Sequence, residues 1–222
     1  IMMVIGDIDE KTALTAVKKH FSGIQRPTTT IPRFHIKEFK QEGLRRVFIE
    51  RPSELNIVSL GIKHAGFPGD DWFTVSALLE VLTSGPESIL HRALVDTGIA
   101  TNVEGMLEPT SEENIGTLTI TLTEGHKHED VETQVLKLIR ALDNKTVTPL
   151  LKKAKAKLLT DELFARDSSL RIAQELTEYV ASGHWTAYAK TPTILENITP
   201  QKVLKAAAEH FIPQRMTIGY FI

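Results

Sequence analysis

The stretch of residues 56–105 constrains the fold of this chain more than any other. Its start alternates apolar Val58, Leu60 and Ile62 with small or polar residues, the pattern of a strand with one buried face. Glycine and proline between positions 66 and 69 interrupt that strand. Two helical segments follow, the second ending at Gly98, and the chain then returns as a strand. The stretch predicts a packing unit and contains no reaction centre.

The first helix of this unit, predicted over 71–83, is apolar on most of its circumference. Its apolar side chains are Trp72, Phe73, Val75, Leu78, Leu79 and Leu82. Asp70 and Asp71 supply oxygens that can cap its N-terminus. Because so little of this helix is polar, we expect it to be sandwiched between a sheet and other helices.

The N-terminal residues predict a short apolar strand at 1–6, followed by a helix that Asp7 or Asp9 caps. We expect that helix to bury one face, formed by Ala13, Leu14, Val17 and Phe21. Residues 26–32 have no periodicity and contain two prolines, which makes them the best linker candidate. The domain boundary is therefore predicted between residues 26 and 27.

The middle of the chain predicts strands. Two are expected at 34–39 and 45–50, around a turn at 41–43, with at least one buried face on the second. The clearest alternation of the chain, at 116–124, places leucine and isoleucine on one face and threonines on the other. Such a strand fits an antiparallel sheet with one solvated face.

The last third predicts helices and a closing strand. Thr148–Pro149 and Thr199–Pro200 each indicate a helix start, and Gly183 a helix end. The predicted helical segments run through 131–142, 149–159, 172–180, 185–198 and 200–211. Residues 215–222 return as a strand in which Met216, Ile218 and Tyr220 share a face. This order predicts an α+β fold, a mostly antiparallel sheet with helices packed on one face.

Composition excludes several classes of function. The 222 residues are 41% hydrophobic and 24% charged with a net charge of -2, so a nucleic-acid partner is not expected. No apolar run approaches the roughly 20 residues of a membrane helix. Without cysteine there is no disulfide or thiolate metal site, and periplasm and cytoplasm are both compatible. The chain opens directly in a strand pattern, so we expect it to be a piece of a longer polypeptide.

The most metal-like cluster consists of His126, His128, Glu129 and Asp130. Its histidines are two positions apart at a junction of strand and helix, whereas metallopeptidase sites use histidines at helical spacing. Acidic residues in a first turn are expected from the helix dipole alone. We interpret the cluster as a solvated helix start; a small metal-binding module is the alternative, which a metal titration tests. The scattered histidines, expected at surfaces or interfaces, are His20, His35, His64, His91 and His184.

Two runs, L-L-E-V-L-T-S-G at 78–85 and L-H-R-A-L-V-D-T-G-I-A at 90–100, resemble the pitrilysin/insulinase zinc metallopeptidases in their non-catalytic, or inactive, domain. The residues V-I-G-D-I-D at 4–9, with F-S-G-I at 21–24, are similar to the final strand and helix of the preceding catalytic domain. The resemblance runs nearly end to end. It implies that residues 1–26 are the tail of that domain and residues 27–222 the non-catalytic domain.

The functional signatures of that family are incomplete here. Its zinc motif is H-x-x-E-H, and the nearest echo is A-A-A-E-H at 206–210, with Ala206 at the first histidine position. Its substrate-binding arginine and tyrosine would fall on Leu94 and Thr101, and Arg92 is out of register. The resemblance therefore implies no catalytic, substrate-binding or metal-ligating residue in this chain.

The resemblance also implies a function for the parent protein. Members of this family are zinc metalloendopeptidases whose modules form two halves that close around unfolded peptides, with zinc activating a water and the motif glutamate acting as base. This chain would add scaffold and chamber wall, with other domains or a partner subunit as its partners and zinc in the catalytic domain. The alternative is a purely structural member, like the core subunits of the respiratory cytochrome complex. An H-x-x-E-H helix about one domain upstream of Ile1 would support the enzyme.

Overall fold

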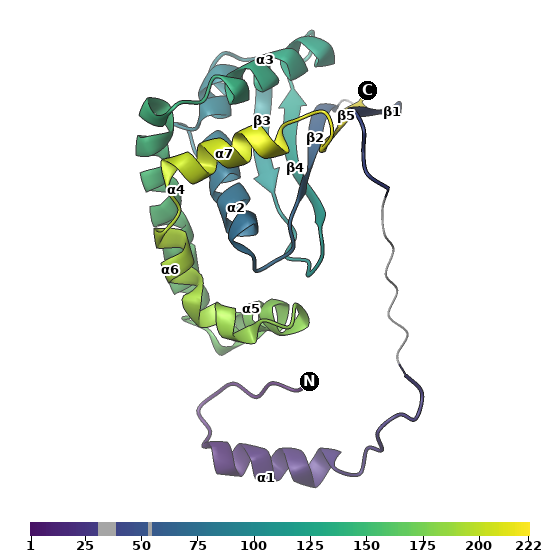
Figure 1. The fold of residues 1–222 in the computed structure, drawn as a ribbon, viewed down its shortest axis with the longest axis vertical. Coiled ribbons are helices and arrows are strands. Elements are labelled where there is room, and N and C mark those ends of the chain that lie inside the picture. The colour runs from purple at the N-terminus through teal and green to yellow at the C-terminus, as the bar shows by residue number, and fades with distance from the viewer. Residues whose placement is uncertain (31–38, 53–54) are drawn as a thin grey trace.

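A five-stranded sheet is the centre of the computed structural model, which describes residues 1–30, 39–52 and 55–222 (Figure 1). The strands are β1 (Arg45–Ile49), β2 (Asn56–His64), β3 (Ala100–Met106), β4 (Asn114–Leu122) and β5 (Met216–Phe221). Their order across the sheet is β1-β5-β2-β4-β3. β1 runs parallel to β5 and the other neighbours are antiparallel. The predicted α+β fold is confirmed.

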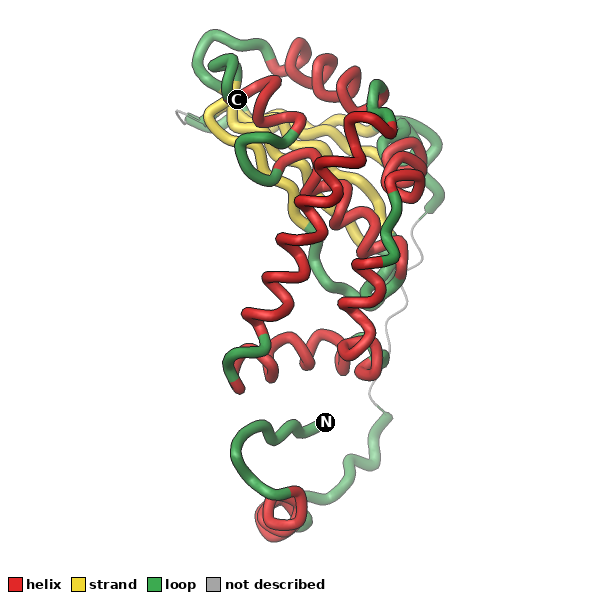
Figure 2. The backbone as a smooth tube through the Cα atoms, turned by 90° about the vertical axis from the view of Figure 1, so that its left-hand side faces the viewer, coloured by secondary structure: helices red, strands yellow, loops and turns green. Residues whose placement is uncertain are grey.

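The helices after β2 lie on one side of this sheet, and α1 lies apart from it (Figure 1). The helices are α1 (Glu10–Phe21), α2 (Asp70–Thr83), α3 (His128–Arg140), α4 (Asn144–Ala165), α5 (Ser169–Ala181), α6 (Thr191–Glu196) and α7 (Pro200–His210), with a π-helical turn η1 (His91–Val95) and a 3₁₀ turn η2 (Trp185–Lys190). Helices α2, α3 and α7 pack on the strands, and α4 packs on α2 and α7. Figure 2, seen from the helical side, shows α4 leading away from the sheet toward α5. No helix in the described ranges is long and apolar enough to cross a membrane.

The core lies between the sheet and α2. Leu60 of β2 is paired with Leu118 of β4 and Ile218 of β5, and all three side chains are almost completely buried. From the other side Leu78 and Leu82 of α2 are fully buried against them. Burial of one such leucine stabilises a fold by about 1.5–3 kcal/mol relative to exposure. The period-two and helical patterns of the sequence therefore meet in one core, as predicted for 56–105.

Gly105 sets how closely α2 approaches the sheet. A Cβ atom at this position of β3 would lie 2.9 Å from Cβ of Leu79 on α2 and 3.2 Å from Oγ1 of Thr83. Real Cβ atoms do not approach so closely, so only glycine allows α2 to lie this near to β3.

The N-terminal residues depart from the prediction. α1 forms, and the Asp9 carboxylate caps it by accepting a hydrogen bond from the Thr12 N–H at 2.9 Å. Residues 1–6, however, form no strand, and α1 buries none of its side chains. A strand needs a neighbour for its backbone hydrogen bonds, and an apolar helix face needs a surface to cover it. The described part of this chain supplies neither to residues 1–24.

Two further expectations, the burial of β1 and the start of α4, also need correction. β1 is exposed at every position rather than buried on one face, because it lies at the edge of the sheet; most of its predicted partner, 34–39, lies outside the described residues. α4 starts at Asn144, where Asp143 accepts from the Thr146 N–H at 2.7 Å, so Pro149 lies inside the helix. The sequence predicted Thr148, just before Pro149, as the N-cap, but the Asp143 carboxylate caps the helix instead. By contrast Thr199 caps α7, as predicted, by accepting from the Lys202 N–H.

Candidate functional site

The histidine cluster after β4 does not converge on one point. His128 turns its ring toward the sheet, where Nε2 lies 3.1 Å from the Phe221 carbonyl oxygen and the ring packs 5.2 Å from that of Tyr220. His126 stays exposed in the turn before α3. His128 is therefore engaged with the sheet, while His126 is left in solvent. Across residues 1–30, 39–52 and 55–222, no three His, Cys, Asp or Glu side chains are placed to hold one.

Beside His128 lies a polar cluster that the sequence did not reveal. The two terminal guanidinium nitrogens of Arg46, Nη1 and Nη2, donate to the Glu132 carboxylate, and Nη2 lies 2.7 Å from Oε1. The Tyr220 hydroxyl also donates to this carboxylate. Burial acts to raise the pKa of Glu132, but the hydrogen bonds from Arg46 and Tyr220 outweigh it and lower that pKa. Burial raises the pKa of Tyr220 to about 12. These groups fasten the edge strand β1 and β5 to α3.

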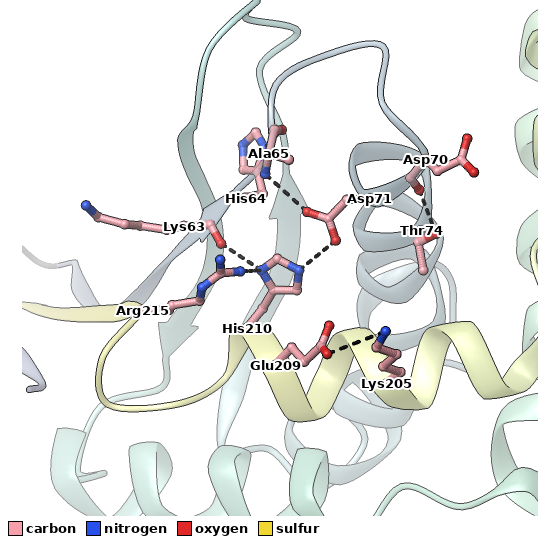
Figure 3. A network of polar contacts seen from close by, with 10 residues as sticks. All are labelled: Lys63, His64, Ala65, Asp70, Asp71, Thr74, Lys205, Glu209, His210 and Arg215. Atoms are coloured by element: carbon pink, nitrogen blue, oxygen red, sulfur yellow. Dashed lines mark hydrogen bonds and ion pairs between the residues drawn. The ribbon is translucent and has the colours of Figure 1, made fainter. Parts of the chain in front are cut away.

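The echo of the zinc motif, 206–210, is a structural junction (Figure 3). His210 is buried at the end of α7, with Nε2 2.9 Å from Oδ1 of Asp71 and Nδ1 2.7 Å from the Lys63 carbonyl oxygen. Glu209 is exposed, and its carboxylate lies 3.7 Å from Nζ of Lys205 instead of beside His210. A catalytic glutamate and a metal-ligating histidine would have to face the same water. These two side chains point apart.

Asp71 is the central acceptor of this junction rather than the helix cap that the sequence suggested. Its Oδ2 accepts the Ala65 N–H at 3.1 Å, while the N-cap position of α2 belongs to Gly69. The hydrogen bond from His210 holds the pKa of the Asp71 carboxyl below its usual value, against the opposing effect of burial. The junction therefore ties α2, α7 and the end of β2 together.

The other histidines divide between surface and core. His20 and His184 are exposed, as expected, and His91 is half-buried with Nδ1 3.2 Å from Oδ1 of Asp96. His64 contradicts the expectation: it is fully buried, and Nδ1 lies 2.8 Å from the Ala65 carbonyl oxygen. Its place on the alternating face of β2, two residues after Ile62, was the available signal for burial. His35 lies outside the described residues.

The two positions aligned with the family's arginine and tyrosine carry different chemistry. Leu94 is fully buried in η1, and Thr101 is exposed on β3, where its hydroxyl donates to the Thr121 carbonyl oxygen at 3.4 Å. Neither side chain can donate the charged hydrogen bonds of an arginine. That this chain contributes no residue equivalent to the family's substrate-binding arginine and tyrosine stays a prediction.

The sheet face opposite the helices is lined by small polar residues. Ser59 of β2 lies directly across from Thr119 of β4, with their hydroxyl oxygens 3.4 Å apart. The residues that share this central part of the face are Ser59, Gly61, Thr117, Thr119, Thr121, Thr217 and Gly219. Isoleucine and valine lie toward its margins, at Val47, Ile49 and Ile115, each more than 40% exposed. This open face of the sheet is a broad surface whose centre consists of small polar residues, with Glu104 of β3, paired with Thr119, as a charged neighbour.

Comparison with solved structures places the fold in a known group. A protease from Helicobacter pylori is 21% identical with a TM-score of 0.88, over 98% of this chain and 54% of that one, so this chain spans about half of that structure. The inactive peptidase domain of a Bordetella parapertussis protein named as a zinc protease is 20% identical, TM-score 0.70, over 78% of this chain and 94% of that one. A chain of complex III₂ from Candida albicans is 12% identical, TM-score 0.78, over 97% and 53%.

Curated proteins yield no significant match to this sequence. The model of one protein family, the peptidase M16 inactive domain, matches residues 2–158. That match covers most of the chain, including β1 to β4 and the helices between them. The solved relatives are domains of larger polypeptides or complexes. The chain therefore belongs to the peptidase M16 inactive domain family, which is related to zinc proteases.

Proposed function

We propose that this chain is the non-catalytic module of a zinc-dependent metalloendopeptidase and that the open face of its sheet is part of the wall of the substrate chamber. The observation that carries the proposal is the one-sided cover of the sheet: all helices that pack on the strands lie on one face (Figure 2). A sheet in a packed domain normally buries both faces or solvates one. A face this flat and weakly polar suits contact with an extended chain.

The chemistry of the open face fits a substrate of variable sequence. Serine and threonine hydroxyls, as at Ser59 and Thr119, can donate to or accept from any peptide backbone. Gly219 leaves the backbone of the sheet open to whatever lies on it, whereas at Gly61 the side chain of Ile115 fills the space that a Cβ would occupy. Glu104, paired with Thr119, adds one negative charge beside the centre of the face, and the hydroxyls around it do not select one side chain over another. Unfolded peptides are therefore the substrate class proposed for the whole enzyme.

Zinc does not fit this chain, and no catalytic step is assigned to its residues. Ala206 offers no ligand, and Glu209 and His210 point apart. The proposal assigns zinc to another domain of the parent protein. We expect the isolated chain to cleave no peptide, with or without added zinc. Chelator-sensitive cleavage of an unstructured peptide by highly purified chain would overturn this.

Residues 1–26 are proposed as the end of the preceding domain in the same polypeptide, with residues 27–222 forming the inactive domain. The support is the uncovered apolar side of this segment, on which Leu14 and Phe21 are 49% and 46% exposed. Such a helix gains stability when a neighbouring sheet covers that side. The partner that the proposal requires is that neighbouring domain, or a partner subunit that carries the equivalent sheet.

Site-specific photo-crosslinking tests the role of the open face. Thr119→p-benzoylphenylalanine places a photoreactive group at the centre of the face, and the same substitution at Lys137, exposed on α3, is the matched control. In the full-length protein, with chelator present so that peptide persists, an unstructured peptide should crosslink to position 119 and not to position 137. Equal labelling at both positions, or none at 119, would contradict the proposal.

A structural subunit without peptidase activity is the second candidate. The specific observation in its favour is the similarity to a chain of complex III₂ from Candida albicans, at a TM-score of 0.78. In that case the open face would contact neighbouring subunits instead of peptides. The sequence of the parent protein separates the two: the enzyme needs an H-x-x-E-H helix in an adjacent domain or partner subunit, and the structural protein does not.

A further inference from the structure

Two glutamates lie inside the corner where α4 meets α5 and η2. Glu162 is on the last turns of α4 and Glu175 is on α5, and each has a carboxylate oxygen, Oε2, that is buried without a hydrogen-bond partner among the described residues. The hydroxyl of Tyr188, on η2, is buried in the same way. Buried polar groups in a folded protein are nearly always hydrogen-bonded. Three such oxygens at one corner call for a functional explanation.

Arg166 is the cation that acts on both carboxylates. Nη2 of Arg166 lies 3.6 Å from Oε2 of Glu162, too far for a strong hydrogen bond. The same guanidinium donates to the Tyr188 carbonyl oxygen at 3.4 Å and lies 5.0 Å from the centre of the Tyr188 ring. Arg166 is thus divided among three partners. With both glutamates ionised, the corner holds more negative charge than this one arginine can balance.

The other groups that face the corner do not remove this excess. Asp161 on α4 is paired with Nζ of Lys157 at 3.3 Å, and Asp167 adds a further carboxylate on the side of Glu175. Arg171 on α5 acts on Glu175 from a distance, and the Tyr179 hydroxyl is engaged with Oγ1 of Thr191 at 2.5 Å. The residues of α2 and α6 that lie next to the two glutamates have no ionisable side chains. They are Trp72, Phe73, Ser76, Thr191 and Leu195, which line a small cavity of about 160 Å³ with both glutamates. This apolar wall keeps bulk water from one side of the carboxylates.

Burial in this setting disfavours the ionised form of each glutamate. It raises the pKa of both carboxyls; the charge of Glu175 raises that of Glu162 further, while Arg166 opposes the change in each. A folded pKa above the unfolded value means that the folded corner binds more protons than the unfolded chain. Its stability is then full below the ordinary glutamate pKa and is lost as pH rises through the raised values.

We propose that Glu162 and Glu175 form a proton-sensitive joint, which holds α5 firmly on α4 in acidic solution and releases it for local opening as the pH rises. Loss of one negative charge lets the remaining carboxylate share Arg166, and a protonated carboxyl can itself donate a hydrogen bond. α5 buries only Tyr179, so few apolar contacts resist its opening. The joint belongs to the α4–α5 corner and is independent of the open sheet face and of any catalytic domain.

Hydrogen–deuterium exchange of the α5 amides, at about pH 4 and about pH 7.5, measures opening of this corner once the intrinsic exchange rates are corrected. In the unmodified protein, protection of residues 169–181 should fall several-fold between the two pH values, while protection of α2 stays constant. E162Q and E175Q remove one charge each without changing shape, so each should keep α5 protected at both pH values. E178Q, at an exposed position of α5, is the matched control and should behave like the unmodified protein.

Two results would overturn the joint. The first is that, in the unmodified protein, the protection of the α5 amides against exchange relative to that of the α2 amides does not change with pH. This measurement needs no variant. The second is a pH dependence that persists in full in both E162Q and E175Q. Circular dichroism establishes that each variant is folded, and if one is not, the comparison of α5 with α2 in the unmodified protein still decides.

Discussion

In the sequence, α1 has one apolar face and α2 is apolar on most of its circumference. Their surroundings in the structure differ completely. Leu78 and Leu82 of α2 are fully buried between the sheet and other helices, whereas α1 buries no side chain at all. Both helices form and both end where local signals indicate. The comparison shows that periodicity identifies the face of a helix that needs cover, but not which surface covers it.

The largest expected effect is on α2. Leu79→Ala should lower the free energy of unfolding by ~2–5 kcal/mol, the range for emptying a buried leucine site. Leu79 is 3% exposed and lies directly above Gly105. The matched control in α1 is Leu14→Ala, 49% exposed, which should change it by no more than about 0.5 kcal/mol. Urea unfolding measures both, and equal losses would show that α1 is as well covered in solution as α2.

Two glycine-to-alanine substitutions test the same contrast between α2 and α1 by adding a methyl group instead of removing side-chain atoms. Gly105→Ala forces a methyl group against Leu79 and should cost about 1–3 kcal/mol, as overpacking of a tight core does. Gly23→Ala, just after α1, meets nothing within 4 Å and should be neutral or slightly stabilising. The urea midpoints of the two variants provide the test. A neutral Gly105→Ala would mean that α2 can move away from β3 without penalty.

Asp71→Asn probes the junction that holds α2 to α7. It weakens the hydrogen bond with His210 and should cost about 1 kcal/mol at neutral pH, since the carboxylate is partly exposed. The folded pKa of Asp71 is lowered, so its contribution is present above the ordinary value near 3.9 and is lost as pH falls through the folded value. Urea midpoints of parent and variant should therefore converge on acidification. Asp9→Asn, at the exposed cap of α1, is the control and should leave the midpoint unchanged.

Local signals in the sequence predicted most of the secondary structure and the core. The alternation of β4 and the shared face of Met216, Ile218 and Tyr220 are both confirmed. The errors arose where the outcome depends on distant partners. β1 pairs in parallel with β5 at the other end of the chain, and Asp71 serves His210, 139 residues away, instead of its own helix end.

The same limit applies to the candidate sites. Spacing alone predicted that His126 and His128 make a poor metal site, and A-A-A-E-H visibly has alanine at the first ligand position, because both are local properties of the chain. The cluster of Arg46, Glu132 and Tyr220 joins three elements that are far apart in sequence. No local pattern marks it. Burial of Glu162 and Glu175 likewise depends on how α4 folds back on α5.

The smallest expected effect on stability comes from removing the N-terminal segment. Deleting residues 1–23 should leave the urea midpoint of the remaining domain unchanged, because α1 buries nothing against the sheet. Self-association should decrease, since Ile1, Met2 and Val4 are 104%, 47% and 51% exposed and form, with α1, an apolar surface. Sedimentation velocity over a range of concentrations compares the two chains. If the truncated chain unfolds, the segment belongs to the core of this domain and the boundary between residues 26 and 27 is wrong.

If the truncated chain folds but associates as before, the apolar side of α1 is not the surface through which copies of the chain meet. The next surface to change is then β1, whose Val47, Phe48 and Ile49 are exposed at the sheet edge.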